Sequence, residues 1–158
     1  MAKKVIIRKA VTEDVPSIVE LWKELMDFHK ARDRFFSRSQ TGDKSFADFI
    51  TGHILNDTSY VLVAEAGKDI IGYCLAILSK YPPVLEIQEY GLVQAIAITK
   101  KYRCKGVGKK LFKKVQTWFS ERGIHRIEAP VAKSNKLARE FWAKMGFTPY
   151  LETVFLEI

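Results

Sequence analysis

The sequence has few of the features that mark secreted, membrane-bound or metal-dependent proteins. Its only cysteines are Cys74 and Cys104, too few for a disulfide framework, so a reducing cytoplasm is the expected compartment. Its three histidines lie far apart, without the spacing of metal ligands. No stretch approaches the roughly 18 apolar residues of a membrane helix. The apolar run in MAKKVIIRKA is also too short for a signal peptide. We expect no metal and no membrane partner.

Repeats, low-complexity tracts and flexible linkers are also missing. A chain of 158 residues, 47% of them hydrophobic, can bury a substantial core without staples. With nowhere for a boundary to fall, we expect a single domain over residues 1–158.

Acidic residues are scarce relative to basic ones, and the basic ones are unevenly spread. The chain has 18 acidic and 26 basic residues, for a formal net charge of +8. Eight basic residues fall between positions 100 and 114: Lys100, Lys101, Arg103, Lys105, Lys109, Lys110, Lys113 and Lys114. This cluster indicates a ligand with several phosphates. We expect no nucleic acid partner, because the cluster is centred on a loop and has little aromatic interleaving.

The same region has the pattern of an anion-binding loop. An apolar strand over Leu92–Thr99 is followed by the loop RCKGVG and then by an amphipathic helix. Glycine lets the main chain approach a ligand without a Cβ in the way. The first amides of a helix lack partners and lie at the positive end of its dipole. The pattern therefore predicts a phosphate cradle, although it matches neither a Walker loop nor a dinucleotide fingerprint.

The rest of the chain alternates between the periodicities of strands and helices. Strands are predicted at Val5–Arg8, Ser59–Ala66, Ile70–Leu78, Leu92–Thr99, His125–Val131 and Pro149–Glu157. Helices are predicted after a Thr12 cap, at Ser45–Leu55, at Val107–Arg122 and at Asn135–Met145. This order of elements is typical of a mixed α/β (α+β) domain around one sheet.

Two blocks resemble the GNAT (GCN5-related N-acetyltransferase) superfamily. Arg103-x-x-Gly106-x-Gly108 is similar to the family's pyrophosphate loop, and the segment from Asn135 to Phe147 is similar to its Asn-x-x-Ala-x-x-(Leu/Phe)-Tyr-x-x-x-Gly-Phe block. The start, Ile7 to Asp14, is a weaker match. The resemblance implies the GNAT fold: a mixed, mostly antiparallel sheet of six to seven strands with about four flanking helices. Its central strands are expected to splay and form the acetyl-CoA cleft.

The resemblance also implies where acetyl-CoA binds as cosubstrate. Main-chain groups of Ile96, Ala97 and Ile98 are expected to contact pantetheine, with an amide near Ile96 or Ala97 stabilising the oxyanion. The pyrophosphate is expected on the loop formed by Arg103, Cys104, Lys105, Gly106, Val107, Gly108 and Lys109. Asn135 is expected to cap the last helix and to contact pantetheine. Trp142 is also expected to contact pantetheine, with plain packing in the core as the alternative.

The catalytic groups depart from the family's pattern. A lysine-like amine is neutral in only about one molecule in a few thousand at pH 7, so a base is useful. Many relatives place a carboxylate on the central strand, where this chain has Gln94 and Ala95. Glu86 and Glu89 are the nearest carboxylates and the candidate bases, with surface solvation as the alternative. An acceptor of lower pKa, such as an α-amino group, would need a base less.

The leaving-group side departs as well, because Trp142 occupies the position of the family's tyrosine. An indole N–H donates a hydrogen bond but is no acid near neutral pH. Trp142 is thus a candidate for stabilising the thiolate, with the proton coming from water, Tyr102 or Tyr150. Cys104 is not expected to act as a nucleophile.

We therefore expect an acetyl-CoA-dependent N-acetyltransferase that uses direct attack in a ternary complex. The acceptor is left open among a small-molecule amine, a peptide N-terminus and a lysine. A homodimer is a further expectation from the resemblance. The alternative is a CoA-binding regulatory or interaction module with weak or no transfer.

Overall fold

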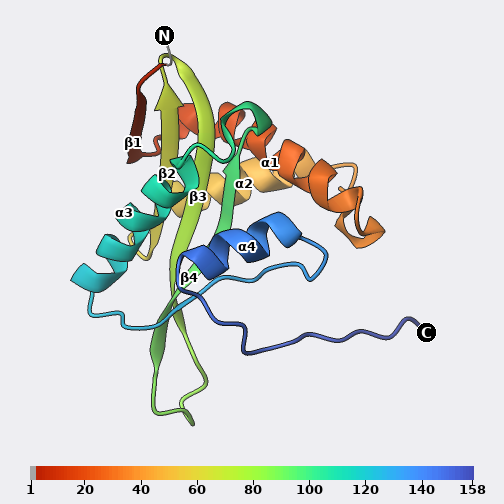
Figure 1. Ribbon diagram of the computed structural model, residues 1–158, viewed down its shortest axis with the longest axis vertical. Helices are drawn as coiled ribbons and strands as arrows, with labels where there is room; N and C mark the ends of the chain where they lie inside the picture. The colour runs from red at the N-terminus through yellow and green to blue at the C-terminus, as the bar shows by residue number, and fades with distance from the viewer. Residues whose placement is uncertain (1–2) are drawn as a thin grey trace.

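The structure is a computed structural model that describes residues 3–158, and its elements form one sheet with helices on both faces (Figure 1). The strands are β1 (Val5–Lys9), β2 (Ser59–Ala66), β3 (Asp69–Lys80), β4 (Glu89–Ile98) and β5 (Ile127–Glu128). The α-helices are α1 (Val15–Lys30), α2 (Gly42–Ile54), α3 (Val107–Glu121) and α4 (Lys136–Lys144). Short 3₁₀ helices are η1 (Thr12–Asp14), η2 (Arg34–Phe36) and η3 (Lys100–Tyr102).

The strands lie in sequence order across the sheet, β1-β2-β3-β4-β5. The first three pairings are antiparallel, whereas β4 and β5 run parallel, as a connection through a helix requires. This confirms the expected mixed, mostly antiparallel sheet with four flanking helices.

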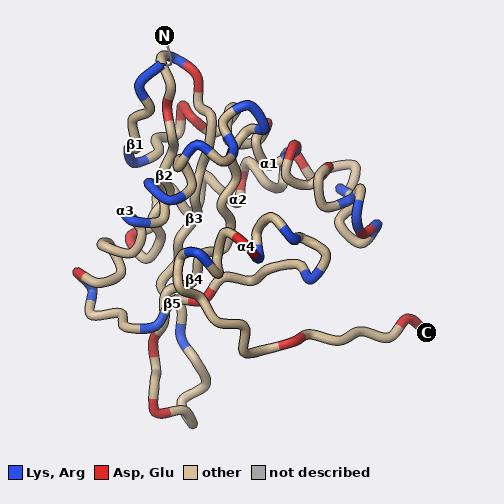
Figure 2. The backbone as a smooth tube through the Cα atoms, viewed as in Figure 1, with Lys and Arg blue, Asp and Glu red and all other residues tan. Residues whose placement is uncertain are grey.

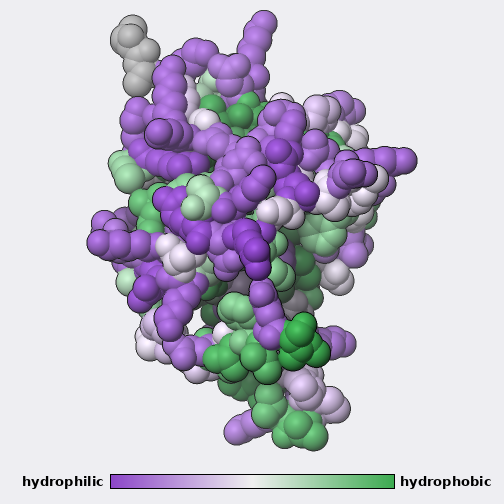
Figure 3. Space-filling view, turned by 90° about the vertical axis from the view of Figure 1, so that its right-hand side faces the viewer, coloured by the Kyte–Doolittle hydropathy of each residue, from purple (hydrophilic) through white to green (hydrophobic). Residues whose placement is uncertain are grey.

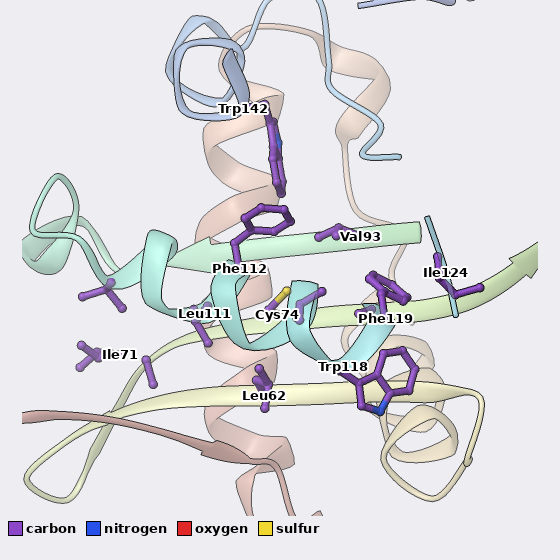
Figure 4. Close-up of a cluster of buried hydrophobic side chains, with 14 of the residues drawn as sticks. Leu62, Ile71, Cys74, Val93, Leu111, Phe112, Trp118, Phe119, Ile124 and Trp142 are labelled. Carbon is purple, nitrogen blue, oxygen red and sulfur yellow. The ribbon is translucent and has the colours of Figure 1, made fainter. Parts of the chain in front are cut away.

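Alternation along the strands divides the core into two layers. On β2 and β3, Leu62 and Cys74 pack with α3 and α4 (Figure 4), while their neighbours Val63 and Tyr73 pack with α1 and α2. All four side chains are fully buried. Because successive strand residues point to opposite faces, near-continuous apolar strands are what a sheet covered on both sides needs.

The prediction of six to seven strands was too high, since five are present in residues 3–158. The predicted strand over His125–Val131 shrinks to Ile127–Glu128, because only these residues pair with β4. The predicted strand Pro149–Glu157 is wrong for the single chain: this exposed segment lies outside every element. Its β-branched and aromatic residues, such as Val154 and Phe155, suit a strand, but no neighbouring strand pairs with it.

The start of α1 also differs from the prediction. Thr12 does not cap the helix: its hydroxyl contacts Glu13, and η1 intervenes before Val15. Asp14 instead stabilises the chain before α1. Its carboxylate accepts hydrogen bonds from the Val11 N–H at 2.9 Å and from the two Arg8 Nη atoms at 2.7 and 2.9 Å. Arg8 holds the pKa of this buried carboxyl below its usual range.

Candidate functional site

The sheet opens along one edge of β4. Only Gly91 and Leu92 pair with β5, so from Val93 to Ile98 no strand of the described chain covers this edge. The register to β3 shifts at the same place: Ala95 faces Leu75 and Val93 faces Ala76, which leaves Gln94 as the extra residue of a β-bulge. A bulge bends a strand and increases its twist. The bulge therefore accounts for β4 and β5 splaying apart.

A cleft of about 490 Å³ lies where β4 and β5 separate. One wall is the β4 segment Val93–Ile96, and the opposite wall is residues 130–132 with Asn135, Ala138 and Trp142. A third side is formed by side chains from α1, η2, α2 and β3. We call six of these the aromatic pocket: Trp22, His29, Phe36, Phe46, Phe49 and Tyr73.

The three β4 residues predicted to contact pantetheine, Ile96, Ala97 and Ile98, differ in what they expose to the cleft. Ile96 lines the cleft, whereas the Ala97 side chain is buried in the layer below α1 and α2. The Thr99 N–H bonds to the Ile71 carbonyl on β3 at 2.9 Å, so alternation directs the main-chain groups of Ile96 and Ile98 to the open edge. The Ile98 carbonyl accepts Arg103 Nε at 2.8 Å, which leaves Ile96 as the free main-chain site.

The loop before α3 gathers unpaired main-chain donors. None of the N–H groups of residues 104–109, which we call the amide loop, has an acceptor among residues 3–158. α3 has no side-chain N-cap, and the loop lies within a largely basic stretch of chain (Figure 2). Six successive unpaired donors at a helix N-terminus offer the geometry that an anion site needs, and anion binding by this loop stays a prediction.

The two glycines of the loop are needed for different reasons. Gly106 is the N-cap of α3 and has a φ of 78°, in the left-handed region that favours glycine. Gly108 lies within α3, where an added Cβ would be 3.1 Å from the Phe141 ring. Gly108 thus provides space for α4 to pack against α3, a role that differs from the backbone approach expected from the motif.

Arg103 is held by the protein itself. Its Nη2 bonds to Glu24 Oε1 at 3.0 Å, in addition to the Nε bond to the Ile98 carbonyl. Glu24, on α1, also accepts Thr99 Oγ1 at 3.1 Å and the Lys100 N–H at 2.9 Å. The Arg103 side chain therefore orients the loop, and Glu24 joins α1 to the end of β4.

Asn135 and Trp142 meet at the far wall. The Asn135 side-chain oxygen accepts the Ala138 N–H at 3.0 Å, which confirms the predicted N-cap of α4 and leaves the amide NH₂ available to a ligand. Trp142 is buried, with its ring 5.4 Å from that of Phe112 (Figure 4) and 4.7 Å from that of Phe147. It also lines the cleft. Packing and a ligand contact are thus compatible for this residue.

The candidate bases lie elsewhere. Glu86 is exposed in the turn between β3 and β4, and Glu89 is exposed where β4 begins, opposite Lys80. Neither lines the cleft, because β4 carries them toward the end of the sheet away from the bulge. Their role as bases stays a prediction. Gln94 and Ala95, in contrast, do lie in the cleft wall.

The candidate acids are also outside the cleft lining. Tyr150 donates to Glu128 at 2.5 Å, and Tyr81 and Arg126 contact the same carboxylate. Burial, together with the hydrogen bond to Glu128, raises the pKa of Tyr81 to about 12. Tyr102 belongs to η3 and does not reach the cleft. The cluster instead ties the β3–β4 hairpin to β5 and residue 150.

Three residues escaped the sequence analysis. Glu24, His29 and Tyr73 lie on α1 and β3, and the last two line the aromatic pocket. The spacing of these three residues in the sequence matches no motif. The histidines, His29 among them, were considered only as metal ligands. The available signal was the helical spacing of Trp22 and Leu25, which gives α1 an apolar face that His29 extends.

Neither cysteine forms a disulfide: Cys74 is buried, which raises its pKa to about 12, and Cys104 is exposed in the amide loop. Between residues 3 and 158, no three His, Cys, Asp or Glu side chains gather where they would hold a metal ion. No helix in the same range has both the length and the apolar character for crossing a membrane.

Comparison with known proteins agrees with this geometry. Residues 18–147 match the model of the acetyltransferase (GNAT) family. The chain is 24% identical over 137 residues to an uncharacterised N-acetyltransferase of Archaeoglobus fulgidus, covering 87% of this chain and 88% of the relative.

Solved structures share the fold. A tetramutant of a Bacillus halodurans protein superposes with a TM-score of 0.86 at 20% identity, covering 97% of this chain and 99% of the other. An aminoglycoside N-acetyltransferase in complex with CoA gives a TM-score of 0.81 at 17% identity, covering 100% and 97% of the two chains.

Proposed function

Since this chain belongs to the acetyltransferase (GNAT) family and is an N-acetyltransferase, we propose that it binds acetyl-CoA across the amide loop and the open edge of β4. The acetyl group would pass to a primary amine by direct attack in a ternary complex. The observation that carries the proposal is the run of six unpaired N–H groups at residues 104–109 beside a cleft that opens along β4. The N–H groups would bind the diphosphate of acetyl-CoA, and the cleft would admit its extended pantetheine arm.

The residues present fit this cosubstrate. Amide donors at hydrogen-bond distance fix a diphosphate, while the lysines around them add an attraction that salt screens. The free main-chain groups of Ile96 and the Asn135 amide suit the polar groups of a pantetheine arm. When bound, acetyl-CoA supplies the activated acyl group, and the chain orients it and excludes water.

A direct test is free-thiol release from acetyl-CoA in the presence of a panel of primary amines, together with calorimetry of CoA binding. We expect saturable CoA binding and amine-dependent thiol release. No heat with CoA or acetyl-CoA would contradict the proposal.

A second candidate is a CoA-binding regulatory module with little or no transfer. It is favoured by one observation: no carboxylate is found among the cleft-lining residues of the described chain. CoA binding without turnover on any amine would support this candidate over the first.

We also propose that the protein forms a homodimer through residues 148–158. Their main chain makes no hydrogen bond to other described residues, and large apolar side chains are exposed, with Val154 and Phe155 at 87% and 84%. Figure 3 shows apolar surface gathered at the lower end of the molecule, at the height of this segment and of the β3–β4 hairpin. β5 is the edge of the sheet. A second copy of the segment would complete this edge as a strand, reciprocally in a two-fold pair.

Light scattering after size-exclusion chromatography tests the dimer. The intact chain is expected at twice its 18.1 kDa mass. Phe155→Asp should shift it to the monomer, and Thr153→Asp, a polar position in the same segment, should shift it less. A monomeric intact chain would contradict the dimer.

A cytoplasmic location is proposed from the free thiols, because the exposed Cys104 is preserved in a reducing compartment. Fractionation of cells that express the chain tests this location, and recovery outside the cytoplasmic fraction would contradict it.

A further inference from the structure

The aromatic pocket has an unusual composition for a site that receives an amine. Its rings form a continuous wall: Trp22 and Phe46 stack at 4.5 Å with 5° between their planes, and Phe46 is 6.3 Å from Tyr73. On the other side, His29 and Phe36 are 4.7 Å apart. Among the described residues that line the whole cleft, none is Asp, Glu, Lys or Arg.

Two buried polar atoms of the pocket lack partners. His29 Nδ1 and the Tyr73 hydroxyl are the buried side-chain polar atoms in residues 3–158 that make no hydrogen bond. Both residues line the same cleft, and Tyr73 is fully buried. Buried polar groups in native proteins are nearly always satisfied, and leaving one unpaired costs about 1 to 3 kcal/mol. A bound ligand with a polar group among apolar atoms would satisfy them.

We propose that the aromatic pocket binds the acceptor as a primary amine on an aromatic or apolar body that carries no second charge, and that His29 accepts the amine proton. This inference rests on the proposed acetyl transfer and narrows its acceptor. A polyamine or an aminoglycoside would bring further ammonium groups into a cleft without a carboxylate to pair them, which is costly. A single ammonium group is tolerated, because aromatic faces attract cations.

The proposed step balances as follows. An acceptor that arrives as an ammonium ion first releases one proton to solvent. The neutral amine nitrogen then attacks the thioester carbonyl carbon, a C–N bond forms, the C–S bond breaks and CoA leaves as the thiolate. The proton lost by nitrogen moves to His29 Nδ1, which has a free lone pair when the ring carries its proton on Nε2. The imidazolium then returns the proton to solvent or to the thiolate, so that the products are an amide and CoA thiol.

The surroundings of His29 keep it neutral. Burial lowers its pKa, and the positive charge of Arg32 lowers it further. Arg32 follows the end of α1, and its guanidinium lies 3.5 Å from the centre of the ring of Phe28, which precedes His29 on α1. From the other elements, Arg34 of η2 pairs with Glu157 at 3.6 Å, and β3 contributes the Tyr73 phenol, whose pKa burial raises. The ring is therefore a base at pH 7, where a proton acceptor is useful.

The acceptor class is tested with the intact chain and three amines: 2-phenylethylamine, spermidine and the aminoglycoside kanamycin. Thiol release should give a kcat/KM for 2-phenylethylamine at least about 10-fold above the others, the discrimination expected from burying an apolar body. An equal or higher value for spermidine or kanamycin would overturn the acceptor class.

The role of His29 is tested with His29→Gln against His125→Gln, which changes an exposed histidine outside the cleft. We expect His29→Gln to lower kcat about 100-fold, to leave the Kd for CoA unchanged and to abolish the acidic limb of the pH–rate profile. His125→Gln should retain all three properties. Equal kinetics for the two variants would overturn the assignment.

Binding provides a readout that does not need turnover. In the CoA-bound protein, the His29 imidazole NMR signals should shift on adding 2-phenylethylamine, and Tyr73→Phe should weaken amine binding. CoA binding and signal shifts without thiol release would overturn acetyl transfer while leaving the pocket intact. Thiol release without any His29 shift would overturn the pocket instead.

Discussion

The amide loop follows the end of β4, whose open edge is one wall of the cleft, whereas the aromatic pocket forms another side of that cleft, and the two regions are built differently. The loop offers main-chain N–H groups from six consecutive residues at the start of α3, so its geometry depends on local conformation and on two glycines. The pocket offers side chains from α1, η2, α2 and β3, which are up to about fifty residues apart in the chain. The loop therefore suits one chemical group, the proposed diphosphate, whereas the pocket suits the shape and charge of a whole molecule, the proposed acceptor.

The largest effect on the loop is expected from Gly108→Val. The added Cβ would lie 3.1 Å from the Phe141 ring, and the branched side chain would push α4 from α3 and distort the adjoining amides. Overpacking of this kind costs about 1 to 3 kcal/mol, so the calorimetric Kd for acetyl-CoA should rise at least about 10-fold. Lys113→Ala removes only an exposed, screened charge and should change the Kd much less. Equal effects would show that charge, not amide geometry, governs the loop.

Glu24→Gln is expected to come next, and it probes the connection between the two regions. Glu24 belongs to α1, which supplies part of the pocket, but its carboxylate holds Thr99, Lys100 and Arg103 beside the loop. Loss of its charge should raise the Kd for acetyl-CoA about 5- to 10-fold, the value of one hydrogen bond of about 1 kcal/mol. Glu20→Gln, an exposed change on the same helix, is the matched control. An unchanged Kd in the Glu24 variant would mean that the loop holds its shape without α1.

A smaller change is expected from Asn135→Asp, compared with Asn135→Ala. Aspartate keeps an oxygen to accept the Ala138 N–H, whereas alanine loses the cap and about 1 kcal/mol of unfolding free energy. Both lose the amide donors, so both should bind CoA a few-fold more weakly, as measured by calorimetry beside thermal unfolding. If only the alanine variant binds CoA more weakly, Asn135 acts solely as the N-cap of α4 and does not contact the ligand.

Asp14→Asn is expected to have the smallest effect on ligand binding by the amide loop or the aromatic pocket. It should lower the free energy of unfolding instead. The folded-state pKa of Asp14 is lowered by Arg8, so its contribution is present above the unfolded value and is lost as the pH falls through the folded value. At pH 7 the variant should lose about 1 to 3 kcal/mol of unfolding free energy, with CoA binding unchanged. Urea unfolding at decreasing pH should show the difference shrinking below about pH 4. A constant difference would exclude the ion pair as its cause.

Part of this molecule was predictable because its signals are local. The strand before the loop, the start of α3 at Val107 and the Asn135 cap depend on residues close to them in the chain, so their patterns predicted them correctly. The predicted role of Gly108 was incomplete, since the ring that lies against it comes from α4.

The strand count failed because a strand needs a partner as well as a suitable sequence. Residues 149–157 have the β-branched and aromatic composition of a strand, but in the single chain no edge pairs with them. Similarly, Glu86 and Glu89 were near the central strand in sequence, and yet the strand carries them to the end of the sheet away from the cleft.

The sequence by itself determined the family, the glycine loop at the start of α3 and the general layout of the sheet, because periodicity and glycine positions act over short distances. Only the tertiary structure decided which side chains line the cleft beside β4. His29, Tyr73 and the surrounding rings come together because α1, η2 and α2 pack over β3 and β4. No local pattern encodes their meeting, since each side chain by itself has the sequence context of ordinary core packing.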